Sequence, residues 1–175
     1  MARKNIKQRI KEHFFLNPSA KLRLREIERA LDLPFPSVLR YSKELFNEGI
    51  LSTESYGNVK FYTAKREEKF LLEKKLFNLK QLYDSGMIDF LREKFSNPSI
   101  VVFGSYSRGE DIEDSDIDIY LETPSGRDIL LDMYEEYLNR KIQLMKHKSI
   151  KEVKNMHLAN NIINGIILNG HIEVF

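Results

Sequence analysis

The feature that most constrains the fold of this chain is a short apolar run followed at once by a glycine–serine turn. Residues 99–103 are mostly apolar, with three β-branched residues in succession, which predicts a strand buried on both faces. The turn that follows directly is Gly104-Ser105-Tyr106-Ser107-Arg108-Gly109. An acidic loop comes next, and residues 114–121 then predict the beginning of a second strand, which contains Asp116 and Asp118. The turn and the acidic strand are therefore the candidates for chemistry.

Asp116 and Asp118 are the candidate metal ligands. Two carboxylates separated by one residue point to the same side of a strand, about 6 to 7 Å apart, so they can clamp a pair of divalent cations. A two-metal phosphoryl-transfer site needs that geometry. Gly104 lets the backbone approach a ligand closely, Ser105 offers a hydroxyl and an amide, and Arg108 adds a fixed positive charge for phosphate oxygens.

This pattern resembles the nucleotidyltransferase superfamily that includes the catalytic domain of DNA polymerase β, and within it the minimal nucleotidyltransferases of bacteria and archaea. The resemblance covers roughly residues 87–175. It implies a mixed sheet backed by helices, and transfer of a nucleoside monophosphate, with AMP expected, from a nucleoside triphosphate to an unknown acceptor. It also implies Mg²⁺ or Mn²⁺ as the cofactor, held by Asp116 and Asp118. The positions implied to bind the nucleotide are Gly104, Ser105, Arg108, Gly109 and Ser115.

The third carboxylate of the family's mechanism is missing where we expect it. Family members supply it from a later strand, where it helps to bind the catalytic metal and activates the attacking hydroxyl. Residues 126–138 predict a helix and residues 140–145 that strand, in which Gln143 takes the carboxylate's place. An amide carries no charge and cannot accept a proton at neutral pH. The catalytic set is then Asp116, Asp118 and Gln143, unless a different register brings in Glu135, Glu136 or Glu152.

Charge divides the chain into two parts. Residues 1–66 carry 14 Lys and Arg against 7 Asp and Glu, whereas the rest carries 14 against 19. A basic segment favours a polyanion such as nucleic acid, and an acidic one needs metal ions to hold a phosphate-bearing ligand. We expect an N-terminal domain over residues 1–65, a linker helix over 66–86, and a C-terminal domain over 87–175.

The N-terminal domain is predicted to contain three helices and a hairpin. The helices cover residues 6–16, 27–31 and 36–48, and the β-prone runs cover 50–53 and 59–63. This order, with the run from Leu33 to Leu51, resembles winged helix-turn-helix transcription regulators, in which the third helix enters the major groove of DNA. The alternative is a basic surface on a domain for dimerisation or protein contacts. The residues implied to contact DNA are Ser37, Leu39, Arg40, Lys43 and Lys60.

Two apolar stripes in the sequence could either pack within the chain or bind another protein chain. Leu72, Leu76, Leu79 and Tyr83 lie at the spacing of a short coiled coil, which fits either a homodimer or packing within the chain. Residues 156–168 predict a helix, followed by a short strand over 171–175. The isoleucines of this predicted helix fit either the core of the domain or a surface that binds a helical partner protein.

The complete prediction is an α+β protein with a winged helix-turn-helix domain and a nucleotidyltransferase domain. The chain has no cysteine, which excludes disulfides and thiol nucleophiles, and no apolar stretch of membrane-spanning length, so we expect a soluble cytoplasmic protein. The leading function is Mg²⁺-dependent nucleotidyl transfer, with the N-terminal domain recruiting nucleic acid or regulating transcription. The alternative is a DNA-binding transcription regulator, or an antitoxin-like protein, whose second domain senses a nucleotide or a partner without catalysis.

Overall fold

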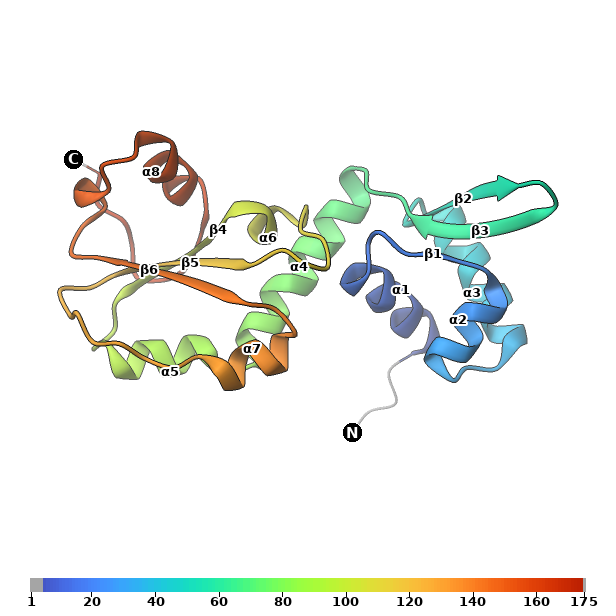
Figure 1. Ribbon diagram of the computed structural model, residues 1–175, viewed down its shortest axis with the longest axis horizontal. Coiled ribbons are helices and arrows are strands. Elements are labelled where there is room, and N and C mark those ends of the chain that lie inside the picture. Colours follow the sequence, from blue (N-terminus) through green and yellow to red (C-terminus); the bar gives the residue numbers. More distant parts are fainter. Residues whose placement is uncertain (1–4, 175) are drawn as a thin grey trace. The chain divides into compact units, whose positions relative to one another are not determined.

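The computed structural model describes residues 5–174, and the chain divides into two compact units, Met1–Lys74 and Lys75–Phe175. The division falls inside α4 (Glu68–Asp84). Each unit contains its own sheet (Figure 1). Among the described residues, no helix combines the length and the apolar character that crossing a membrane requires.

The described part of the first unit contains three complete helices, the beginning of α4 and a three-stranded antiparallel sheet of order β1-β3-β2. Its elements are α1 (Ile6–Leu16), β1 (Lys21–Leu22), α2 (Leu24–Leu31), α3 (Phe35–Asn47), β2 (Leu51–Tyr56) and β3 (Val59–Ala64). The Asn5 side chain caps α1 by accepting a hydrogen bond from the Lys7 amide. Gly49, just after the end of α3, has a positive φ of 75°, which helps to end that helix. The core of this unit contains the fully buried Ile10, Phe14, Ile27, Val38 and Leu45.

The hairpin of the first unit is longer than the sequence indicates. Strand β2 extends to Tyr56, and its pairing with Val59 leaves a two-residue turn that contains Gly57 at a φ of 59°. The tip is held by an edge-to-face contact between the rings of Tyr56 and Phe61, 5.9 Å apart. Cross-strand side chains thus extend the pairing beyond the residues with the highest β propensity.

The second unit is built on a mixed four-stranded sheet of order β6-β5-β4-β7. Strand β4 is antiparallel to β5 and β7, and β5 is parallel to β6. The elements are α5 (Met87–Lys94), β4 (Ser99–Phe103), α6 (Gly104–Arg108), β5 (Ile117–Glu122), α7 (Asp132–Leu138), β6 (Ile142–His147), the 3-10 helix η1 (Ile150–Glu152), α8 (Met156–Ile163) and β7 (Ile166–Asn169). This part of the chain is therefore a mixed α+β structure.

Helices cover both faces of this sheet. Alternate residues of β4 and β5, such as Val102 and Ile119, pack with residues of α5 and α7 on one face. On the other face, Val101 and Tyr120 pack with Ile162 of α8. Figure 1 shows α5 and α7 on one side of the strands and α8 on the opposite side. The end of the sheet where β4 leads into α6 carries the candidate site.

The helix predicted over residues 126–138 is shorter in the structure. It begins at Asp132, because the preceding loop makes local bonds instead: the Ser125 amide donates to Thr123 Oγ1, and the Arg127 amide donates to Ser125 Oγ. Helical spacing over residues 126–138 also predicts an apolar stripe, made of Ile129, Leu130, Met133, Tyr134 and Tyr137, and the structure buries only part of it. Tyr134 is buried, but three of its members are more than half exposed, namely Leu130, Met133 and Tyr137.

The prediction of a helix over residues 156–168 and a strand over 171–175 is also wrong in part. The predicted helix over residues 156–168 ends at Ile163, and Ile166–Asn169 form strand β7 against β4. Gly165 permits this approach, because a Cβ there would lie 2.7 Å from the Val102 carbonyl oxygen. Residues 171–174 form no strand, and Phe175 lies outside the described residues.

Candidate functional site

The turn after β4 is shaped around a carboxylate of β5. Gly104 has a φ of 71°, and a Cβ on it would lie 2.3 Å from Asp118 Oδ2. Side chains larger than hydrogen therefore do not fit unless the carboxylate moves. Ser107 Oγ donates to the Gly104 carbonyl, 2.8 Å away, and Gly109 ends α6 in the left-handed conformation. The strand end, the turn and Asp118 form one packed group.

A buried asparagine anchors this turn to α4. Asn78 Nδ2 donates to the Tyr106 carbonyl, 2.9 Å away, and to Asp111 Oδ1, 2.8 Å away. Asn78 and Asp111 are 3% and 2% exposed, so these bonds lie out of water. Sequence reasoning missed both residues. The signal available for Asn78 was its spacing, because a residue four positions before the apolar Leu82 lies on the same face of the helix, and that face packs into the core.

The two candidate metal ligands lie at the beginning of β5. Asp118 is the second residue of the strand and is half-buried, whereas Asp116 directly precedes the strand and is exposed. Burial raises the pKa of the Asp118 carboxyl, and the negative charge of Asp116 raises it further. A cation between the two carboxylates would relieve that repulsion, since opposite charges favour the ionised form.

Gln143 lies directly opposite Asp118 in the parallel β5–β6 ladder. The alternative carboxylates are engaged in other bonds or lie on other elements. Glu135 accepts hydrogen bonds from Lys141 Nζ at 2.6 Å and from the Ile142 amide at 2.9 Å, one on each oxygen. Glu152 follows β6 in η1, where it accepts from the Lys148 amide. Glu136 is exposed on α7.

No group of three or more His, Asp or Glu side chains able to hold a metal ion is found among residues 5–174. The site offers two carboxylates and one amide oxygen. Carboxylates are hard oxygen ligands of the kind that Mg²⁺ prefers, and Mg²⁺ commonly takes one or two of them together with substrate phosphates. The residues present are therefore of a kind that fits Mg²⁺.

The remaining predicted nucleotide-binding residues differ in accessibility. Arg108 is 54% exposed and paired with Glu110 through its Nε, 2.6 Å from the carboxylate. Ser105 is half-buried at the start of α6. Ser115 Oγ accepts a hydrogen bond from the Ile112 amide, so this hydroxyl shapes the loop before β5.

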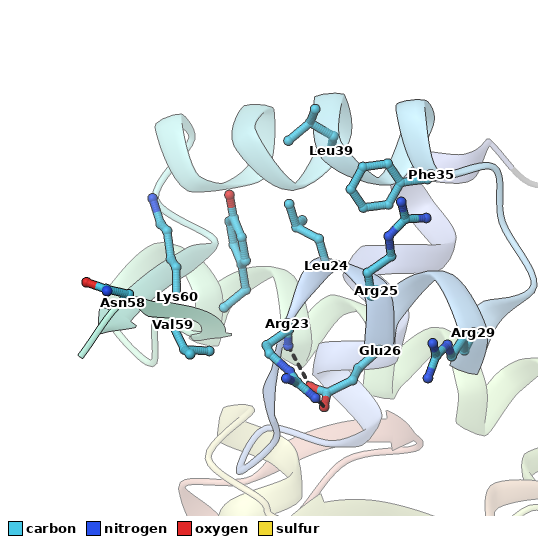
Figure 2. Close-up of a pocket in the computed structure, with 11 residues that line it drawn as sticks. Arg23, Leu24, Arg25, Glu26, Arg29, Phe35, Leu39, Asn58, Val59 and Lys60 are labelled. Atoms are coloured by element: carbon cyan, nitrogen blue, oxygen red, sulfur yellow. Dashed lines mark hydrogen bonds and ion pairs between the residues drawn. The ribbon is translucent and has the colours of Figure 1, made fainter. Parts of the chain in front are cut away.

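The residues predicted to contact DNA lie on α3 and β3 of the first unit. Leu39 and Lys60 line one pocket of about 690 Å³ between α2, α3 and the hairpin (Figure 2). Arg40 and Lys43 are exposed on α3, and Arg40 Nε donates to Glu44. Ser37 is half-buried. The other residues that line the pocket are Arg23, Leu24, Arg25, Glu26, Arg29, Phe35, Asn58, Val59 and Tyr62.

The pocket combines apolar and cationic side chains. The Arg25 guanidinium lies 3.8 Å from the centre of the Phe35 ring, and Lys60 Nζ lies 5.6 Å from the Tyr62 ring. Arg23 is bound to the single carboxylate of the lining, Glu26. Figure 2 shows Leu39 and Phe35 on the helix that forms one wall. This composition leaves a positively charged rim over an apolar surface.

Comparison with known proteins identifies the second unit. A family model described as "Nucleotidyltransferase domain" matches residues 85–165. Three proteins of Methanocaldococcus jannaschii, each named "Putative protein adenylyltransferase", are similar to this chain. The first is 42% identical over 67 residues, which are 34% of this chain and 67% of that protein. The second is 43% identical over 34% of this chain and 76% of that protein, and the third is 37% identical over 44% and 81%.

The chain therefore belongs to the nucleotidyltransferase family, as a minimal nucleotidyltransferase. At the level of reaction class, this family membership supports transfer of a nucleoside monophosphate from a nucleoside triphosphate.

Proposed function

We propose that the second unit transfers AMP from ATP to an acceptor hydroxyl at the site formed by Gly104, Asp116 and Asp118. The observation that carries the proposal is the contact between Gly104 and Asp118, because it brings a phosphate-binding type of turn against a candidate metal ligand. The adenylyltransferase names of the relatives favour AMP as the transferred group.

In the proposed reaction, Asp116 and Asp118 would hold Mg²⁺ together with the triphosphate, and Arg108 would contact a phosphate oxygen. When bound, Mg²⁺ would offset the negative charge that builds up on the phosphates. The acceptor oxygen forms a bond to the α-phosphorus while the bond from that phosphorus to the α–β bridging oxygen breaks. The electron pair of the broken bond leaves with pyrophosphate.

The acceptor proton has no carboxylate to receive it at position 143. Gln143 cannot accept a proton at neutral pH, so the proton passes to solvent. Loss of a positioned general base typically costs about 10²- to 10⁴-fold in rate. We therefore propose a slow enzyme. The same residue favours the second candidate function, a regulatory domain that binds a nucleotide and does not turn it over.

Transfer of label from ATP labelled at the α-phosphate tests the enzymatic proposal. We expect labelled product with the unaltered chain and Mg²⁺, and loss of at least 90% of it with Asp116→Asn. Asp114→Asn is the matched control, since it removes the same charge from an exposed residue two positions earlier. Equal labelling by both variants would refute the role of Asp116, and Mg²⁺-dependent binding without transfer would favour the regulatory function.

We also propose that the first unit is a winged helix-turn-helix domain that binds duplex DNA. Two observations support this proposal: three helices are followed by a hairpin, and residues 1–66 contain more basic than acidic residues. Phosphate contacts release counterions, so affinity should fall steeply between 50 and 200 mM salt, by about 10³-fold for six contacts. A flat salt response in fluorescence anisotropy would instead favour a protein partner for this unit.

A further inference from the structure

The β5–β6 ladder places the neutral Gln143 opposite Asp118, where a third carboxylate would help to bind a second cation. We propose that the site binds its nucleoside triphosphate with one divalent cation, and that Gln143 limits it to one. This inference rests on the proposed function, since it assumes that the triphosphate binds beside Asp116 and Asp118. It departs from the two-metal arrangement expected from the sequence.

Charge and ligand number favour a single cation. Two ionised carboxylates, Asp116 and Asp118, balance the charge of one divalent ion, and triphosphate oxygens and water complete its coordination. A second cation, next to the acceptor hydroxyl, would have fewer phosphate oxygens and would depend on protein carboxylates. The residue opposite Asp118 is the neutral Gln143, whose amide oxygen is a weaker ligand for that ion.

Two carboxylates of the same sheet region, Glu135 and Glu122, are already engaged in other bonds. Both oxygens of Glu135 are occupied by Lys141 and by the backbone amide that begins β6. Glu122 lies four residues after Asp118 on β5, which places it about 13 Å away at 3.3 Å per residue. It also accepts a hydrogen bond from the Ile150 amide, 2.8 Å away.

A fixed positive charge lies beside the site. The carbonyl oxygen of Lys141 accepts a hydrogen bond from the Ile117 amide at 2.8 Å, so Lys141 is next to Asp116 in the ladder. Its ammonium is held by Glu135 at 2.6 Å. This pairing neutralises Glu135, which makes that carboxylate a poor ligand for a second cation.

Counting bound Mn²⁺ tests the inference without relying on activity. The probe is Mn²⁺ with α,β-methylene-ATP, whose α–β bridge is not cleaved, supplied at one equivalent to the chain. Free Mn²⁺ is followed by electron paramagnetic resonance, and bound analogue by equilibrium dialysis. We expect one bound Mn²⁺ per chain for the unaltered protein.

Gln143→Glu should add a second Mn²⁺, or tighten a weak second site at least tenfold, because it restores the third carboxylate. Gln143 is exposed, so the variant should fold, which circular dichroism would verify. Gln81→Glu on α4 is the matched control, since it adds the same charge away from the ladder, and it should leave the count at one.

The outcomes separate the two proposals. Two Mn²⁺ bound to the unaltered chain with the analogue in place would overturn the single-cation inference and leave the proposed function standing. A count of one in folded Gln143→Glu would overturn the role given to Gln143. Failure of the unaltered chain to bind the analogue at any Mn²⁺ concentration would overturn the proposed function, and the inference with it.

Discussion

Replacing Gly104 with alanine should damage the site through one carboxylate. The added Cβ would lie 2.3 Å from Asp118 Oδ2, and real Cβ contacts essentially never fall below 3.0 Å, so the oxygen must move by about 0.7 Å (3.0 minus 2.3). Displacements near 1 Å in a catalytic group can cost about 10²-fold in rate. We therefore expect Gly104→Ala to weaken Mg²⁺-dependent ATP binding and to lower transfer by about 10- to 100-fold.

The same substitution also has a backbone cost that must be separated from this effect. Gly104 has a φ of 71°, and an L-residue in the left-handed region costs about 1 to 2 kcal/mol. Gly86 supplies the control, because its φ is 77° and a Cβ there would meet nothing within 4 Å. Both alanine variants should lose stability through this backbone cost, with a fall in Tm of about 4 to 8 °C per kcal/mol for a unit near 100 residues.

The two variants are compared by thermal unfolding and by calorimetric titration with ATP and Mg²⁺. We expect both variants to lose the stability that the backbone cost explains, and only Gly104→Ala to lose ATP affinity as well. If Gly104→Ala binds ATP and Mg²⁺ as well as Gly86→Ala does, the contact with Asp118 does not position the carboxylate, and the account of the turn is refuted.

Three further predictions concern other parts of the chain. Asn78→Ala removes the buried donor to Asp111, so it should cost about 1 to 3 kcal/mol in urea unfolding; a loss equal to that of Asn161→Ala, an exposed control, would contradict this. The pKa of Asp118 is raised by burial and a neighbouring charge, so its ionised form destabilises the fold above the folded-state pKa, and this cost disappears as the pH falls through that pKa. Asp118→Asn should therefore raise Tm at pH 7 and not at a pH below both folded and unfolded pKa values, and an unchanged Tm at pH 7 would count against the burial argument. Lys43→Ala should lower the slope of log K against log salt by about one if Lys43 contacts a DNA phosphate, whereas an unchanged slope in anisotropy titrations would exclude that contact.

Much of the framework around the site was predictable from the sequence. Strand β4 has the predicted bounds, Ser99–Phe103, because an apolar β-branched run between Pro98 and Gly104 has few alternatives. The resemblance of the second unit to nucleotidyltransferases is confirmed by the comparisons. Local signals were sufficient there, since the strand, its glycine and the Asp-x-Asp pattern lie within 20 residues of one another.

The errors occur where long-range pairing decides between two local options. The isoleucines near the C-terminus fit a helix by spacing and a strand by β-branching, and pairing with β4 selected the strand at Ile166. On α4, the predicted stripe includes Leu72 and Leu76, which are 54% and 57% exposed, whereas Phe70 and Leu82 are fully buried. Apolar residues occur on more than one side of this helix, so spacing alone could not identify the packed face.

Binding of ATP measured by calorimetry, with and without Mg²⁺, tests the central claim most directly. If Gly104, Asp116 and Asp118 form a nucleotide site, the unaltered chain should bind ATP with Mg²⁺, much less tightly without it, and Asp116→Asn should lose the Mg²⁺-dependent part. Absence of ATP binding by the folded chain in the presence of Mg²⁺ would contradict the claim.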